Sequence, residues 1–137
     1  MSVVLVDTSV WFLLFRRNGP ASVPEVAALQ RFLRGEELVA ITGAIAQELI
    51  YGLSASNAAD AVTQALAALP YLAPALEDHL AAARMQRLLR AEGIQMSGAD
   101  ALIVQLALTH DLLLLTTDRD FTHAARHVPL RLWTQGH

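Results

Sequence analysis

The sequence contains no cysteine, and this absence limits the kinds of site that the chain can build. Disulfide bonds and metal sites with thiolate ligands are excluded, while a reducing cytoplasm is compatible with the composition. Lysine is absent as well, so all 10 basic residues are arginine. Because genomic base bias also produces an all-arginine composition, no function follows from this feature alone.

Long apolar runs are missing too. No stretch approaches the roughly 18 uncharged apolar residues that a membrane-spanning helix needs. At the N-terminus, Asp7 interrupts the apolar stretch Val3–Phe15 and no basic segment precedes it, which argues against a secretory signal. We therefore expect a soluble protein of the cytoplasm.

Charge is scarce. Charged residues make up 17% of the chain and hydrophobic residues 54%, so disorder is excluded and apolar surface remains for a partner or for self-association. The length of 137 residues predicts one domain, residues 1–137. The net charge of −3 at first argues against a nucleic-acid partner, because phosphate binding normally leaves a basic footprint.

Short apolar runs alternate with longer helical stretches. The runs lack polar alternation, as expected for strands that are buried on both faces of a parallel sheet. They are Val3–Val6, Leu38–Ile41, Leu112–Leu115, Leu130–Trp133 and, more weakly, Tyr71–Leu72. Helices are predicted at Pro24–Leu33, Ala44–Leu53, Asn57–Leu69, Ala75–Arg90 and Ala99–Thr109. This alternation predicts an α/β fold with three layers, α/β/α, and a central parallel sheet.

Two aspartates follow predicted strands. Asp7 comes directly after the first strand, and Asp118 comes shortly after the leucine-rich one. Ligands of open parallel sheets bind beyond the carboxyl ends of the strands, so both side chains are expected at the same edge. Each aspartate also fits a simpler role as the N-cap of the next helix.

Two further acids are predicted on helices near this edge. Glu48 flanks an apolar stripe, where a carboxylate needs a neutralising partner such as an arginine or a cation. Asp100 completes Ser97-Gly-Ala-Asp100, which resembles a capping box, and capping alone would explain it. Four converging acids repel one another unless a cation is bound. Oxygen ligands suit Mg²⁺ or Mn²⁺, and none of the five histidines has metal-site spacing.

Four motifs together resemble the PIN-domain family, particularly the VapC toxins of bacterial and archaeal toxin–antitoxin pairs. The segment Val3–Trp11, with Asp7-Thr8-Ser9, resembles the opening of these proteins. The other three acidic motifs are matched, in order and at similar spacing, by Ala46-Gln47-Glu48-Leu49, Asp100-Ala101-Leu102-Ile103 and Leu115–Phe121. The resemblance covers essentially the whole chain.

The resemblance implies a sheet of strand order 3-2-1-4-5, a Mg²⁺-dependent endoribonuclease and inhibition by an antitoxin that lies in an apolar groove. By position it makes Asp7, Glu48, Asp100 and Asp118 the metal-site acids, with Thr8 and Thr116 as supporting hydroxyls. Asp120 is a possible further ligand, although Asp118 is favoured. In the predicted mechanism, Asp7 and Asp100 hold a first metal ion, and Asp118 and Glu48 complete its shell.

Several partner contacts and rival functions remain open. Arg16, Arg17 and Arg119 are candidate phosphate contacts. Val10, Trp11, Leu14 and the alanine-rich helices are candidates for an antitoxin groove, with the core as the alternative for Trp11 and Phe12. A homodimer or a larger complex with antitoxin is expected. The alternatives are a non-catalytic module that binds RNA or protein and, less favoured without a lysine, a phosphatase with Asp7 as nucleophile.

Overall fold

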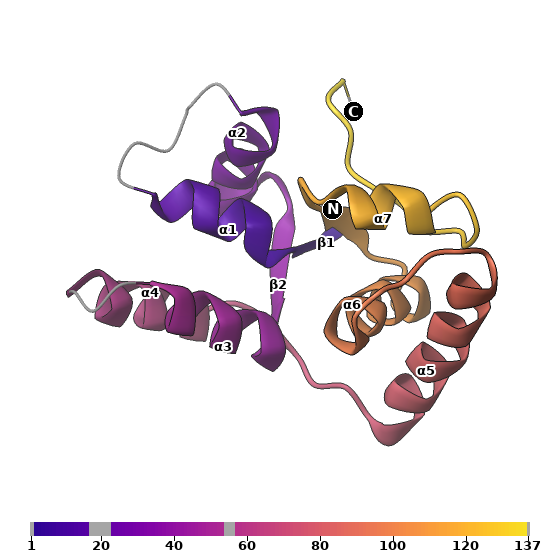
Figure 1. The fold of residues 1–137 in the computed structure, drawn as a ribbon. Helices are drawn as coiled ribbons and strands as arrows, with labels where there is room; N and C mark the ends of the chain where they lie inside the picture. The colour runs from indigo at the N-terminus through magenta and orange to yellow at the C-terminus, as the bar shows by residue number, and fades with distance from the viewer. Residues whose placement is uncertain (1, 17–22, 54–56, 137) are drawn as a thin grey trace.

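A computed structural model describes residues 2–16, 23–53 and 57–136 (Figure 1). Its centre is a parallel sheet in the order β3-β2-β1-β4. The central strand β1 (Val3–Val6) pairs with β2 (Leu38–Thr42) on one side and β4 (Leu113–Leu115) on the other. The short strand β3 (Tyr71–Leu72) pairs with β2. Helices cover both faces of the sheet, which explains why these strands are apolar without alternation.

Seven α-helices are present in the described residues. They are α1 (Thr8–Phe15), α2 (Pro24–Arg31), α3 (Gly43–Gly52), α4 (Asn57–Ala67), α5 (Leu76–Ala91), α6 (Gly98–Thr109) and α7 (Arg119–Ala124). Helices α5 and α6 lie side by side, and α1 packs against both α2 and α3 (Figure 1). The five predicted helices are therefore present, each displaced by two residues or fewer at either end.

Helix α2 continues into a π-helical turn, Phe32–Glu36, before the chain enters β2. Gly35 has a φ of 115° in this turn, a conformation that side chains with a Cβ atom rarely adopt. The end of the predicted helix Pro24–Leu33 thus has a backbone cause, because Gly35 turns the chain toward the sheet.

The predicted fifth strand, Leu130–Trp133, is reduced to a single bridge. Only Leu132 pairs with β4, opposite Leu114 and in parallel. The Leu114 N–H donates to the Arg131 carbonyl, and the Trp133 N–H donates to the Leu114 carbonyl, both at 2.9 Å. The sheet of the described residues thus has four strands in the expected order 3-2-1-4, and this bridge stands in place of the predicted fifth strand.

The core is one cluster built around β1 and the helix faces on either side. Val10 and Trp11 belong to it, with exposed fractions of 0% and 2%. The prediction that these two residues line a groove for an antitoxin is therefore wrong, and the alternative core assignment of Trp11 is correct. Large apolar side chains are exposed elsewhere, on α3, β3 and α5: Tyr51, Tyr71, Leu76, Leu80 and Leu88. No helix of the described residues combines the length and apolar character needed to cross a membrane.

Candidate active site

Asp7 lies at the carboxyl end of β1 and caps the N-terminus of α1. Its carboxylate is buried, with an exposed fraction of 6%. The Oδ2 atom accepts from the Ser9 hydroxyl at 2.7 Å, the Thr116 hydroxyl at 2.9 Å and the Ser9 N–H at 3.4 Å. All these hydrogen bonds reach one oxygen, so Oδ1 remains available for another partner. Asp7 thus caps a helix and presents a carboxylate at the sheet edge.

Ser9 joins the ends of two adjacent strands and was not predicted as a site residue. Besides bonding to Asp7, its hydroxyl accepts from the Thr117 N–H at 3.2 Å, across from β1 to the chain after β4. The Thr116 hydroxyl in turn accepts from the Asp118 N–H at 2.9 Å. The predicted supporting residue Thr8 is buried, but the hydroxyl that reaches Asp7 from this turn belongs to Ser9. The pattern of an aspartate N-cap with a serine two residues on would have identified it.

Asp100 lies in the first turn of α6, whose N-cap is Ser97. The Ser97 hydroxyl accepts from the Asp100 N–H at 3.1 Å, which is one half of the expected capping box. Partial burial and the negative charges of Asp7, Asp118 and Glu48 together raise the pKa of the Asp100 carboxyl from 3.8 to about 6, while the hydrogen bond with Ser97 opposes this rise. The charges of all three other predicted acids therefore act on the Asp100 carboxyl.

Asp118 caps α7, where its Oδ1 atom accepts from the Asp120 N–H at 2.9 Å. Carboxylate oxygens of Asp100, Asp118 and Asp120 lie within 4.8 Å of one another. The sequence favoured Asp118 over Asp120, but both reach this group. The charges of Asp7 and Glu48 raise the pKa of Asp100, but among the described acids these two do not belong to the group of three.

Glu48 is exposed on the second turn of α3, although its place beside an apolar stripe predicted that it is buried. No arginine of the described residues pairs with it. The apolar stripe of α3 instead consists of Ile45 and Leu49, both buried, with Glu48 turned to the adjoining solvent face. Its charge still raises the pKa of Asp100, so the side chain belongs to the same edge of the sheet without being desolvated.

The donors of this edge fit a hard divalent cation. Oxygen-only sets suit Mg²⁺ or Mn²⁺, and opposite ligands of Mg²⁺ are about 4 Å apart, close to the observed limit of 4.8 Å. Helices α1 and α3 begin within two residues of the ends of β1 and β2, α7 begins four residues after β4, and Asp100 lies in the first turn of α6. Their N-terminal dipoles partly offset the repulsion among the carboxylates. The residues present therefore match such an ion in chemistry and spacing.

Two of the three predicted phosphate contacts lie in the described residues, and both are exposed. Arg16 is exposed just after α1, and Arg119 is exposed directly after Asp118. Arg17 lies outside the described residues.

Acids thus gather beyond the carboxyl ends of a parallel sheet, which is where α/β proteins with open sheets bind their ligands. The family model for the PIN domain matches residues 4–127 of the sequence. The chain belongs to the PIN domain family. No curated protein matches the sequence closely enough to be called a relative.

Solved structures share the fold at low sequence identity. A chain of VapBC2 from Rickettsia felis, bound to a DNA fragment from its promoter, superposes with a TM-score of 0.72 at 18% identity and covers 96% of this chain and 99% of that chain. A chain of FitAcB from Neisseria gonorrhoeae gives 0.72 at 21% identity, covering 98% and 99%. VapC20 from Mycobacterium tuberculosis, described as a sarcin–ricin loop cleaving toxin, gives 0.67 at 21% identity, covering 93% and 98%.

Proposed function

We propose that the protein is a Mg²⁺-dependent endoribonuclease and the toxin of a toxin–antitoxin pair. The observation that supports this most directly is the group formed by Asp100, Asp118 and Asp120 within 4.8 Å at the carboxyl edge of the sheet. Membership of the PIN family supports a nuclease. The toxin assignment draws on the similar folds of VapBC2, FitAcB and VapC20.

In the proposed site, Asp100, Asp118 and Asp120 supply the carboxylate oxygens that hold the ion. Asp7 adds its free Oδ1 atom, while Ser9 and Thr116 fix the other oxygen. The bound cation lowers the pKa of a water molecule and neutralises phosphate charge. We assign to the exposed Glu48 the role of positioning that water or a ribose hydroxyl. Mn²⁺ is expected to replace Mg²⁺, since both accept the same oxygen donors.

The proposed partners are an antitoxin protein and a second copy of this chain, with which it forms a homodimer. The exposed apolar side chains support this, above all Tyr51 with an exposed fraction of 91% and Leu76 with 72%. Apolar groups in such numbers are typical of interaction surfaces.

The variant Asp7→Asn tests the nuclease proposal. Asparagine still caps α1 but loses the negative charge, so we expect Mg²⁺-dependent cleavage of single-stranded RNA to fall at least 100-fold while the metal-free fold is as stable or more stable. Cleavage is followed by gel with purified protein, with EDTA as the metal-free control. The matched variant Asp60→Asn changes an exposed acid on α4 and is expected to cleave normally.

Equal cleavage by Asp7→Asn and the wild type would remove Asp7 from the site. A wild-type protein that binds RNA but cannot cleave it with Mg²⁺ or Mn²⁺ would instead support the non-catalytic alternative.

A further inference from the structure

The second half of α5 presents three arginines to solvent. Arg84, Arg87 and Arg90 follow one another at intervals of three residues, and all three are exposed. The two ion pairs found within the described residues involve other arginines. The guanidinium groups on α5 therefore have no carboxylate partner in the part of the chain that the structure describes.

The opposite face of α5 packs against the rest of the protein, so the three arginines are not needed to hold the helix in place. Ala82, Met85 and Leu89 are buried and place α5 against the body of the protein, beside α6. Arginine at a helix C-terminus gains modestly from the helix dipole, but that effect is confined to the last turn. Arg84, two turns before the end of α5, lies outside it.

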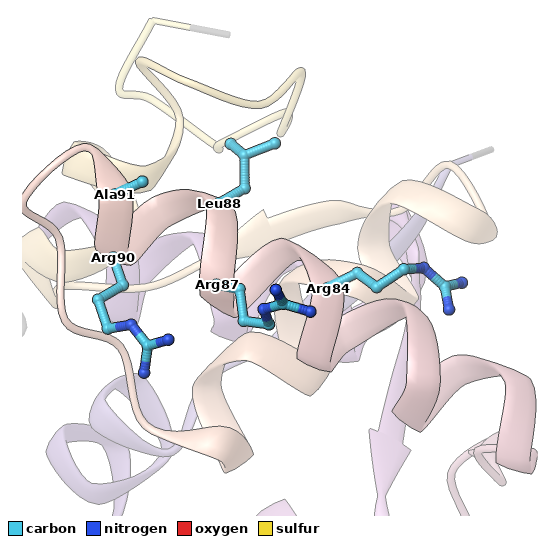
Figure 2. A pocket seen from close by; sticks show the side chains of 5 residues that line it. All are labelled: Arg84, Arg87, Leu88, Arg90 and Ala91. Carbon is cyan, nitrogen blue, oxygen red and sulfur yellow. The ribbon is translucent and has the colours of Figure 1, made fainter.

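The arginines border two neighbouring hollows. Arg84, Arg87 and Arg90 line an open hollow of about 570 Å³ together with Leu88 and Ala91. In Figure 2, Arg87 and Arg90 point to one side of α5, whereas Leu88 and Ala91 point to the other. Arg87 and Arg90 also line a second hollow of about 530 Å³, which extends to Ser97.

The second hollow extends from Arg87 and Arg90 to the start of α6, the helix that carries Asp100. Ser97 is the N-cap of α6 and accepts a hydrogen bond from the Asp100 N–H at 3.1 Å. The Gln86 side chain donates to the Met96 carbonyl at 2.8 Å and so fastens the connecting loop to α5. The basic end of α5 is thus held at a fixed position next to the turn that presents Asp100.

We propose that Arg84, Arg87 and Arg90 bind the backbone phosphates of the RNA strand beside the cleavage site. The inference rests on the proposed function for the identity of the ligand. The acidic edge repels phosphate and the whole chain has a net charge of −3, so a strand needs a local cationic surface to approach. Guanidinium groups bind phosphate oxygens in bidentate pairs, and the three arginines span about 9 Å of helix axis, enough for a few nucleotides. Continuity with Ser97 favours this strand over an acidic partner protein.

Binding of a fluorescein-labelled single-stranded RNA 20-mer, measured by anisotropy in EDTA across a salt series, tests the proposal. The Asp7→Asn protein is the reference, so that the RNA stays intact. Each lost phosphate contact should reduce the slope of log affinity against log salt by about 0.7 and weaken binding about fivefold at 0.1 M salt. The variant with Arg84→Gln, Arg87→Gln and Arg90→Gln should therefore bind roughly 100-fold more weakly. Thermal melting checks that it folds.

Two controls sharpen the result. Arg34→Gln removes an exposed arginine from the turn before β2, at the opposite edge of the sheet, and should leave binding unchanged. Arg87→Lys keeps the charge and should retain the salt slope, losing only the bidentate part of the affinity.

Unchanged affinity and slope in the triple variant would overturn the proposal, whether or not the wild type cleaves RNA. So would a triple variant that binds RNA normally but loses a partner protein, which would assign the arginines to that protein. Weaker RNA binding by the triple variant, in a wild type that does not cleave, would support the phosphate contacts and contradict the nuclease proposal alone.

Discussion

The two carboxylate oxygens of Asp7 have different surroundings. Oδ2 accepts hydrogen bonds from Ser9 and Thr116, and these bonds fix the carboxylate between the ends of β1 and β4. Residues that orient a metal ligand typically change metal affinity 10- to 100-fold when they are removed. Thr116 is therefore a positioning residue for Asp7.

Thr116→Val should lower Mg²⁺ or Mn²⁺ affinity about 10-fold, because the isosteric valine removes the bond that holds the Asp7 carboxylate. Calorimetric titration with Mn²⁺ measures the affinity. The control is Thr63→Val, since the exposed Thr63 hydroxyl bonds only to the Ala59 carbonyl within α4. Equal Mn²⁺ affinity in the two variants would show that Thr116 does not position Asp7.

Asp100 makes the stability of the metal-free protein depend on pH. Its folded-state pKa of about 6 lies above the ordinary 3.8, so the folded protein binds the proton more tightly than the unfolded chain. This contribution to stability is complete below pH 3.8 and is lost as pH rises through about 6. At neutral pH the charged Asp100 therefore lowers stability.

Asp100→Asn should stabilise the metal-free protein at pH 7 by about 1 kcal/mol, a value reduced for solvent screening because the side chain is only partly buried. Urea unfolding in EDTA at pH 4 and pH 7 measures the effect. The gain should be much smaller at pH 4, where the wild-type carboxyl is largely protonated. A gain that is equal at both pH values would contradict the charge argument.

At the level of elements, the packing of α1 against α3 sets where Glu48 lies relative to Asp7. Gly52, the last residue of α3, makes this contact possible, because a Cβ atom there would overlap the ring of Phe12 on α1. The site therefore depends on a glycine that takes no part in its chemistry.

Gly52→Ala should destabilise the protein by about 1–2 kcal/mol, since overpacking costs more than the helix propensity of alanine returns. Gly98→Ala is the control, because no atom lies within 4 Å of its added Cβ, and it should be neutral or slightly stabilising. Denaturant unfolding measures both. Phe12→Leu should partly rescue Gly52→Ala, and a lack of rescue would show that the ring is not the cause.

The whole molecule concentrates negative charge at one edge of the sheet, so a divalent cation should stabilise it. A ligand at 100 times its dissociation constant adds about 2.7 kcal/mol to folding stability, or a few degrees in melting temperature. We expect this rise with Mg²⁺ or Mn²⁺ but not with NaCl of equal ionic strength. Asp118→Asn and Asp120→Asn should each reduce the shift, because both carboxylates belong to the group around Asp100. An unchanged shift in Asp120→Asn would leave Asp118 alone as the ligand.

Local patterns in the sequence were sufficient to predict most elements of the fold. Apolar runs fixed β1, β2 and β4, and capping residues such as Ser97 placed the helix starts, because both depend on neighbours along the chain. The segment Leu130–Trp133 was predicted as a strand as well, yet it pairs with β4 through a single bridge.

The sequence by itself determined which acids follow strands and open helices, since those positions are set by local order along the chain. Only the tertiary structure decided their surroundings: Glu48 is solvent-exposed, Ser9 bonds to Asp7, and Asp120 joins Asp118 beside Asp100. It also placed Arg87 and Arg90 of α5 around the same hollow as Ser97. Exposure and distance depend on how separate elements pack, and a one-dimensional pattern does not contain that information.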